Sequence, residues 1–172
     1  MKLIAIAAYS GEPTSQMKKS LEIFIDELAD TCGKEVILLI GGYWGFMRVL
    51  VDRAISRGIT TILFPPIEAE HVLFPKDAIV LRTGLSYRLR SVIMVRSADV
   101  LVSLGGAAGT LQEIITAYTE GKPILVLGGT GLATDKIRYF SPYVDDRKLS
   151  KIEIYNDPED LVKALCNLIK EL

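Results

Sequence analysis

Residues 86–113 read SYRLRSVIMVRSADVLVSLGGAAGTLQE and decide the fold. Within this stretch, residues 99–104 are almost entirely apolar and rich in β-branched side chains, as is typical of a strand buried on both faces of a parallel sheet. The next five residues are small, so their backbone N–H groups can approach a ligand. Apolar residues then recur at helical spacing, at Leu111, Ile114, Ile115 and Tyr118. The stretch therefore predicts a central strand that leads through a glycine loop into a helix.

The junction between this loop and the following helix is suited to an anion. The first N–H groups of a helix have no partner within it, and the positive end of the helix dipole lies there as well. Phosphate is the natural ligand of such a junction, and the hydroxyl of Thr110 adds a further polar group. We predict a phosphate-binding loop made of Gly105, Gly106, Ala107, Ala108, Gly109 and Thr110.

The residues alone favour a structural interpretation of Glu113. Thr110 and Glu113 have the spacing of a capping box, in which the threonine caps the helix and the glutamate returns to the N-cap N–H. Arg90, on the helix before the strand, could likewise be an ordinary surface arginine.

A second glycine loop follows a predicted strand at residues 35–40. It contains Gly41, Gly42 and Gly45, and the helix after it has apolar residues at helical spacing. Glycines between a strand and a helix allow the backbone to approach a ligand, although a tight turn would need them too. Tyr43 and Trp44 could stack on a base, or they could fill a crevice or a subunit contact.

The first predicted strand, residues 2–8, leads into a loop that carries Ser10 and Gly11. These small polar residues would lie at a ligand-facing strand end. The alternative is a plain helix entry with Thr14 or Ser15 as the N-cap residue.

The whole chain alternates strands with helices, without an internal repeat. Further strands are predicted at residues 60–64, 78–82, 123–127 and 152–155, and a final helix begins at Asp157 and Pro158. This order predicts an α/β fold: a single Rossmann-like domain over residues 1–172, with a parallel sheet and helices on both faces. Ligands of such sheets bind at the carboxyl ends of the strands. The glycines after residue 127 precede no clear helix and are expected to form a flexible connection.

Composition and charge narrow the range of partners. The chain has 172 residues, 49% of them hydrophobic and 24% charged, with a net charge of −1. This charge argues against a nucleic-acid partner, and no apolar run reaches the ~20 residues of a membrane span. The apolar N-terminal run is too short for a signal peptide. We expect a cytoplasmic protein with a small-molecule partner.

The metal-binding and redox residues are few. Cys32 and Cys166 lack metal or redox spacing and are expected to be two unpaired thiols. His71 is the sole histidine, so we predict no metal site and no cofactor. A nicotinamide cofactor is disfavoured because the first loop lacks the G-x-G-x-x-G pattern. Asn and Gln occur only twice each, which hints at a thermophilic source.

Two motifs resemble the lysine decarboxylase-like family, whose best-understood members are the Lonely Guy phosphoribohydrolases. The run GGAAGTLQE, from Gly105 to Glu113, resembles the family motif PGGxGTxxE, and IGGYWGFM at residues 40–47 resembles GGGxxGxM. Arg90 aligns with the arginine of the family's HxRK motif. The chain departs from these patterns at Gly105, Ala107 and Ser91, where the family has proline, glycine and lysine. The alanine is expected to alter the loop or strain it if the backbone needs a positive φ there.

The resemblance implies a function. It assigns Arg90 and Glu113 to an active site that hydrolyses the N-glycosidic bond of a nucleoside 5′-monophosphate, with the phosphate on the glycine loop and with Ser10, Gly11, Gly41, Gly42 and Gly45 nearby. The same fold is also used by molybdenum-cofactor carriers, so a non-catalytic nucleotide-binding or carrier protein is the alternative. Members of the family are usually dimers. The apolar residues 92–95 would suit a buried helix or a subunit interface, and we expect a homodimer or a higher oligomer.

Overall fold

The computed structural model of the protein describes all of residues 1–172, and its seven strands form one sheet in which every pair is parallel. The order across the sheet is β4-β3-β2-β1-β5-β6-β7. The predicted Rossmann-like α/β fold is therefore confirmed. The strands are β1 (Lys2–Ala7), β2 (Val36–Ile40), β3 (Thr60–Leu63), β4 (Ile79–Val80), β5 (Val100–Ser103), β6 (Ile124–Leu127) and β7 (Ile152–Tyr155).

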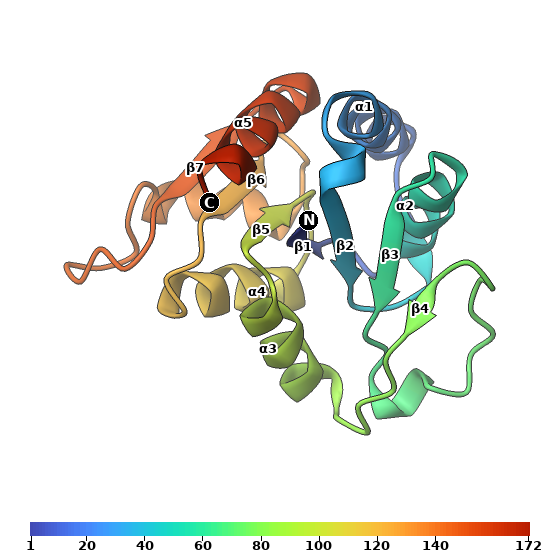
Figure 1. Cartoon of the computed structure of the whole chain (residues 1–172). Helices are drawn as coiled ribbons and strands as arrows, with labels where there is room; N and C mark the ends of the chain where they lie inside the picture. The colour runs from blue at the N-terminus through green and yellow to red at the C-terminus, as the bar shows by residue number, and fades with distance from the viewer.

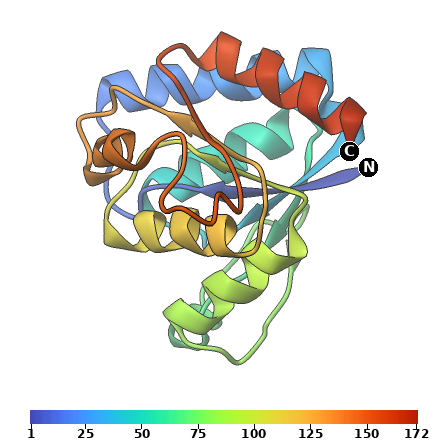
Figure 2. The same ribbon diagram turned by 90° about the vertical axis from the view of Figure 1, so that its left-hand side faces the viewer.

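Five α-helices cover the two faces of this sheet. Helices α1, α2 and α5 lie on one face, and α3 and α4 pack side by side on the other (Figures 1 and 2). The α-helices are α1 (Ser15–Thr31), α2 (Gly45–Ser56), α3 (Tyr87–Ser97), α4 (Ala108–Thr119) and α5 (Pro158–Glu171). Three 3₁₀ helices complete the structure: η1 (Gly33–Glu35), η2 (Ile67–Ala69) and η3 (Ala133–Phe140).

Alternation along the central strands gives the protein two separate apolar cores. In β1, Ile4 and Ile6 point into the core beneath α1, α2 and α5, whereas Ala5 and Ala7 point into the core beneath α3 and α4. Successive side chains of a strand point to opposite faces, so a strand that is apolar at every position must be covered on both sides. The run of residues 99–104 meets this condition because every residue of β5 is buried.

Both predicted helix caps are present. The Thr14 side chain accepts a hydrogen bond from the N–H of Met17 at 3.2 Å and so begins α1. The Asp157 side chain accepts from the N–H groups of Glu159 and Asp160, with Pro158 in the first turn of α5. These side-chain oxygens satisfy N–H groups that have no partner within the helix.

The fourth predicted strand is present but shorter than predicted: β4 covers only Ile79–Val80, lies at the sheet edge and pairs only with β3. Another prediction about local structure was wrong. The glycines after β6 lead into a helix after all, the 3₁₀ helix η3, in which Thr134 and Ile137 are buried. A 3₁₀ helix has three residues per turn, so the 3.6-residue pattern used for prediction does not detect it.

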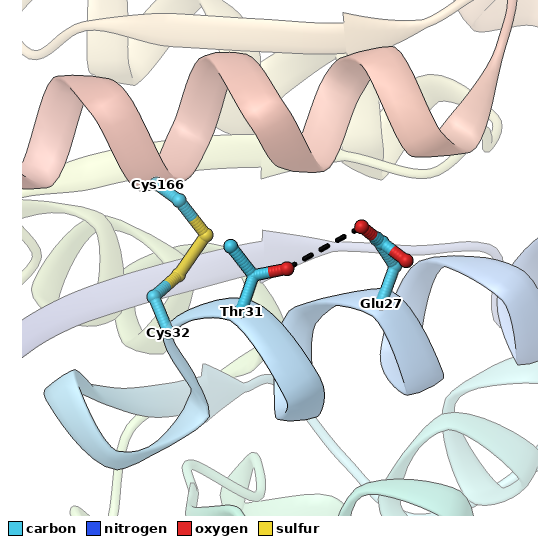
Figure 3. Close-up of a disulfide and its surroundings, with 4 residues drawn as sticks. All are labelled: Glu27, Thr31, Cys32 and Cys166. Atoms are coloured by element: carbon cyan, nitrogen blue, oxygen red, sulfur yellow. Dashed lines mark hydrogen bonds between the residues drawn. A yellow bond between two sulfur atoms is a disulfide. The ribbon is translucent and has the colours of Figure 1, made fainter.

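The prediction of two unpaired thiols was also wrong, because Cys32 and Cys166 form a disulfide. Cys32 caps the end of α1 and Cys166 lies on the buried face of α5, with their Cα atoms 5.9 Å apart (Figure 3). The two cysteines are 134 residues apart in the chain, a separation that carries no information about contact. Only the packing of α5 against α1 brings them together.

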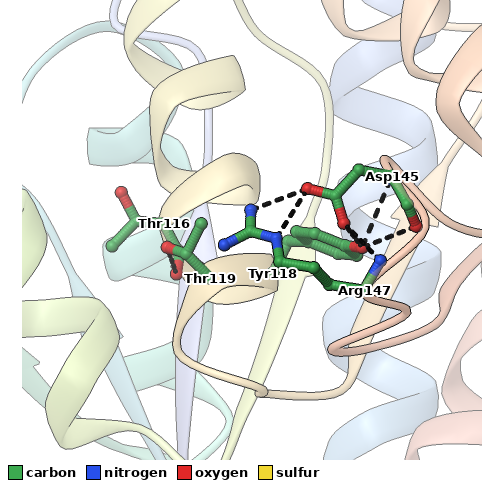
Figure 4. A network of polar contacts seen from close by, with 5 residues as sticks. All are labelled: Thr116, Tyr118, Thr119, Asp145 and Arg147. Atoms are coloured by element: carbon green, nitrogen blue, oxygen red, sulfur yellow. Dashed lines mark hydrogen bonds and ion pairs between the residues drawn. The ribbon is translucent and has the colours of Figure 1, made fainter.

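The long connection between β6 and β7 is held to α4 by a polar network. The Tyr118 hydroxyl donates to the Asp145 carboxylate at 2.8 Å, and the Arg147 guanidinium donates to the same carboxylate (Figure 4). Hydrogen bonds from Arg147 and Tyr118 lower the pKa of Asp145 to about 2. The connection therefore has a fixed position over the end of α4.

No helix in the protein has both the length and the apolar surface that crossing a membrane would require.

Candidate functional site

The strand order places a crevice at the sheet edge between β1 and β5. Successive strands run outward from β1 in one direction and from β5 in the other, so the loops after these two strands diverge and leave a crevice. A pocket of about 290 Å³ lies there. It is lined by Ala8, Ser10, Trp44, Met47, Tyr87, Arg88, Arg90, Ser91, Ala107, Gly109, Thr110, Gln112 and Glu113.

The first turn of α4 presents free donors at this pocket. The helix begins at Ala108, and its first internal hydrogen bond runs from the N–H of Leu111 to the carbonyl of Ala107 at 3.0 Å. The N–H groups of Ala108, Gly109 and Thr110 have no acceptor in the protein. They lie at the positive end of the helix dipole, which favours an anion.

The glycine loop before α4 has a conformation that fits its departures from the family motif. Gly105 has a φ of 98°, which proline, with φ fixed near −65°, cannot adopt. Ala107 has a φ of −104°, so the backbone does not need a positive φ at this position and the alanine causes no strain. Gly106 does not line the pocket, because its N–H donates to the Thr134 hydroxyl at 2.9 Å and its carbonyl accepts from the N–H of Thr134 at 3.1 Å.

Arg90 is a buried cation whose one ion pair, with Glu113, is too long for a hydrogen bond. The residue is 6% exposed, and its Nε and Nη1 atoms make no hydrogen bond. The nearest acidic atom to Nη1 is Glu113 Oε1 at 3.6 Å, which is too long for a hydrogen bond. Burial lowers the pKa of the guanidinium, but arginine stays protonated in proteins. The guanidinium lies where a side chain at Gly41 would be, so the second glycine loop makes room for it.

Glu113 lies beside Arg90 and is not part of a capping box. Thr110 is the third residue of α4 rather than its N-cap, and the Glu113 Oε1 atom accepts a hydrogen bond from the Ser91 hydroxyl at 2.8 Å. The other carboxylate oxygen, Oε2, accepts no hydrogen bond from the protein. Burial raises the pKa of Glu113, while the Arg90 charge and the Ser91 hydroxyl oppose that rise.

The raised pKa of Glu113 makes stability depend on pH. Between the ordinary value of 4.5 and the raised value, the folded protein binds more protons than the unfolded chain, so the free energy of unfolding falls as the pH rises. As the pH rises through this window, Glu113→Gln should become more stable relative to the wild type. Above the window, the difference in the free energy of unfolding between the two proteins should stay constant. Urea unfolding of both proteins between pH 4 and pH 8 measures the difference. A difference that does not change with pH would contradict the prediction.

The loops that follow β1 and β2 pack against each other, and only some of their residues line the pocket. Ser10 contributes to the lining, and the Gly11 carbonyl accepts a hydrogen bond from the N–H of Phe46 at 2.9 Å. Gly45 has a φ of 52° and lies against the backbone of Ser10 and Gly11, which leaves no space for a Cβ atom. Of the predicted residues, Gly11, Gly41, Gly42, Gly45, Gly105, Gly106 and Ala108 do not line the pocket.

A model of the SLOG cluster4 family matches residues 5–162. The chain belongs to the SLOG cluster4 family. An uncharacterized protein from Archaeoglobus fulgidus is 30% identical over 127 residues, which is 74% of this chain and 82% of that protein. The X-ray structure of the protein TM1055 superposes with a TM-score of 0.83 at 30% identity, over the full length of both chains. A Moco (molybdenum cofactor) carrier protein from Chlamydomonas reinhardtii has a TM-score of 0.79 at 24% identity, covering 99% of each chain, which shows a shared fold.

Membership in the SLOG cluster4 family confirms the resemblance to lysine decarboxylase-like proteins.

The pocket of this SLOG cluster4 protein also contains residues that the motifs did not predict. Tyr87 and Arg88 come from the same helix as Arg90, and Gln112 comes from α4. Tyr87 lies three residues before Arg90 and four before Ser91, so helical spacing around Arg90 was the available signal. Tyr87 meets Trp44 edge-on, with ring centroids 6.2 Å apart.

Proposed function

We propose that the pocket binds a phosphate-bearing, nucleotide-like small molecule. The observation that carries this proposal is the buried Arg90 side chain, whose Nε and Nη1 atoms make no hydrogen bond, in a pocket that the first turn of α4 also lines. Buried donors without acceptors are rare because each loses its hydrogen bonds to water. An anionic oxygen between the guanidinium and the helix terminus would satisfy both sets of donors.

The other residues that line the pocket support the nucleotide-like part of the ligand. Arg88 adds a second cation, and Glu113 is the only acidic residue of the lining. Trp44 and Tyr87 offer aromatic surface on which a planar base or a pterin can pack. A volume of about 290 Å³ is at the small end for ligand pockets, which favours a mononucleotide over a dinucleotide.

A second candidate function is hydrolysis of the N-glycosidic bond of a nucleoside 5′-monophosphate. The specific observation in its favour is Glu113, whose Oε2 atom has no partner while Oε1 is held by Ser91. Cleavage of this bond develops positive charge on the ribose, as in other glycosyl transfers. The ionised carboxylate would stabilise that charge or accept a proton from the attacking water, and the base would leave with the bond electrons.

Carriage without catalysis is the competing function. The Chlamydomonas relative is named a Moco carrier protein, and a pterin phosphate presents the same two features as a nucleotide, a planar ring and an anion. Arg90, the terminus of α4 and the aromatic pair would serve either ligand. For such a carrier the cofactor is cargo, and Glu113 would contact it without reacting.

A homodimer is part of the proposal. Helix α3 carries Leu89, which is 56% exposed, and Ile93, which is 42% exposed, on a surface without a partner in the monomer. Exposed apolar side chains grouped on one helix are typical of protein contacts.

Ligand binding and turnover are tested in one experiment with the wild type and Glu113→Gln. The proteins are incubated with AMP, GMP, CMP, UMP and inorganic phosphate, thermal shift reports binding, and chromatography reports free base. We expect a nucleotide to raise the unfolding temperature of both proteins. Base release by the wild type alone would establish the hydrolase, whereas stabilisation without release would favour non-catalytic binding over hydrolysis. If no compound stabilises the wild type, the proposed function is wrong.

A further inference from the structure

Gly106 is the second glycine of the loop at residues 105–110, which we call the anion loop. It is held in place by a residue that lies 28 positions later in the chain. Its N–H donates to Thr134 Oγ1 at 2.9 Å, and its carbonyl accepts from the Thr134 N–H at 3.1 Å. Thr134 is completely buried in η3, which belongs to the connection between β6 and β7. Both backbone groups of Gly106 are therefore already used within the protein.

This pairing determines where the next N–H group points. In a trans peptide, the carbonyl oxygen and the following N–H point in opposite directions. Because the Gly106 carbonyl points at Thr134, the N–H of Ala107 points away from η3, and it has no acceptor in the protein. Ala107 itself lines the pocket. Thr134 holds this peptide unit through its N–H and the preceding one through its hydroxyl, so the two bonds together fix the direction of the Ala107 N–H.

The segment that carries Thr134 is itself firmly held. The Asp135 carboxylate accepts hydrogen bonds from the N–H and hydroxyl of Thr130, at 3.1 and 2.9 Å, and from the Gly131 N–H at 2.7 Å. Thr130 in turn packs against Gly105, where an added Cβ atom would come within 2.9 Å of its methyl group. The anion loop therefore rests on a rigid support from a distant part of the chain.

We propose that Thr134 is a positioning residue of the anion site and that it orients the N–H groups of residues 107–110 toward a bound phosphate. This inference rests on the proposed function, because it concerns the same pocket. Gly106 is then a structural residue of the loop and not a ligand donor. The ligand class addressed is a phosphate monoester, since the donors that Thr134 orients are backbone N–H groups converging on one anion.

The test compares Thr134→Val, Thr134→Ser and a matched control, Tyr118→Phe. Valine keeps the shape of threonine and the backbone N–H that binds the Gly106 carbonyl, so it removes only the acceptor of the Gly106 N–H. Serine retains the hydroxyl. Tyr118→Phe removes a hydrogen bond from the same β6–β7 connection without touching Gly106. Calorimetric titration uses the nucleotide selected from the monophosphate panel, or inorganic phosphate.

We expect Thr134→Val to weaken binding about 10-fold, and Thr134→Ser and Tyr118→Phe to stay within about 2-fold of the wild type. Equal affinity in Thr134→Val and the wild type would overturn the positioning role while leaving the proposed function intact. Equal losses in Thr134→Val and Tyr118→Phe would also overturn it, because general loosening of the connection would then explain both. Absence of binding by the wild type would overturn both proposals.

Amide hydrogen exchange of the wild type provides a test that does not depend on a variant that folds. The Gly106 amide should exchange slowly with or without phosphate, because Thr134 already protects it. The amides of residues 107–110 should be fast in the free protein and slow with phosphate. Protection of Gly106 that appears only with phosphate would overturn the proposal, since Gly106 would then be a donor to the ligand.

Discussion

Replacing Arg90 with methionine should weaken phosphate binding about 100-fold or more. Methionine preserves most of the buried volume of the arginine side chain but removes the charge and the unpaired N–H donors. Each hydrogen bond from a charged donor contributes about 1.5–3 kcal/mol, and two such bonds account for the expected loss. Titration calorimetry with the stabilising monophosphate measures the affinity directly.

Two arginines on the same helix are the controls for this substitution. Arg96 pairs with Glu120 on the surface and does not line the pocket, so Arg96→Gln should bind as the wild type does. Arg88 lines the pocket but is exposed, so water screens its charge and Arg88→Gln should lose only about 2- to 5-fold. An Arg90→Met protein that binds as tightly as Arg96→Gln would disprove the anion site.

Removing Arg90 also affects Glu113. The carboxylate would lose the positive charge that opposes its desolvation, and its pKa would rise further. Adding Glu113→Gln to Arg90→Met should therefore restore stability without restoring phosphate affinity. This outcome separates a lost ligand contact from a damaged fold.

Removing the disulfide with Cys32→Ala and Cys166→Ala should lower the free energy of unfolding by about 3–5 kcal/mol. The crosslink closes a loop between positions 134 residues apart, and a long loop restricts the unfolded chain strongly. For a chain of this length, the loss corresponds to a fall of about 6–20 °C in Tm. Urea unfolding and calorimetry measure both quantities.

Reducing agent provides the control for the disulfide. Unfolding in dithiothreitol should destabilise the wild type but leave the double alanine variant unchanged. Equal stability of the reduced and oxidised wild type would contradict the prediction.

Residues 99–104 predicted their own environment because a strand with apolar side chains on both faces is stable only when both faces are covered. Ser10, Arg90, Glu113 and the loop from Gly105 to Thr110 were predicted to share one site. Ser10, Arg90, Glu113 and three of the six loop residues, Ala107, Gly109 and Thr110, line one pocket. The local sequence pattern around Glu113 predicted the wrong structural role for this residue. The spacing from Thr110 matched a capping box, but the helix begins two residues before that threonine. Sequence spacing gives relative positions within a helix and does not give its first residue.

The sequence by itself determined the α/β class, the order of the strands and α-helices, the caps at Thr14 and Asp157, and the family resemblance. These features depend on local patterns: the caps on neighbours within about one helical turn, the strands and helices on periodicity within one element, and the resemblance on short motifs. Only the tertiary structure decided that Ser91 holds Glu113, that Arg90 occupies the space beside Gly41, that Thr134 holds Gly106 and that Cys32 meets Cys166. These contacts join residues far apart in the chain. They depend on how helices pack across the sheet, which is fixed by the shapes of all the buried side chains together.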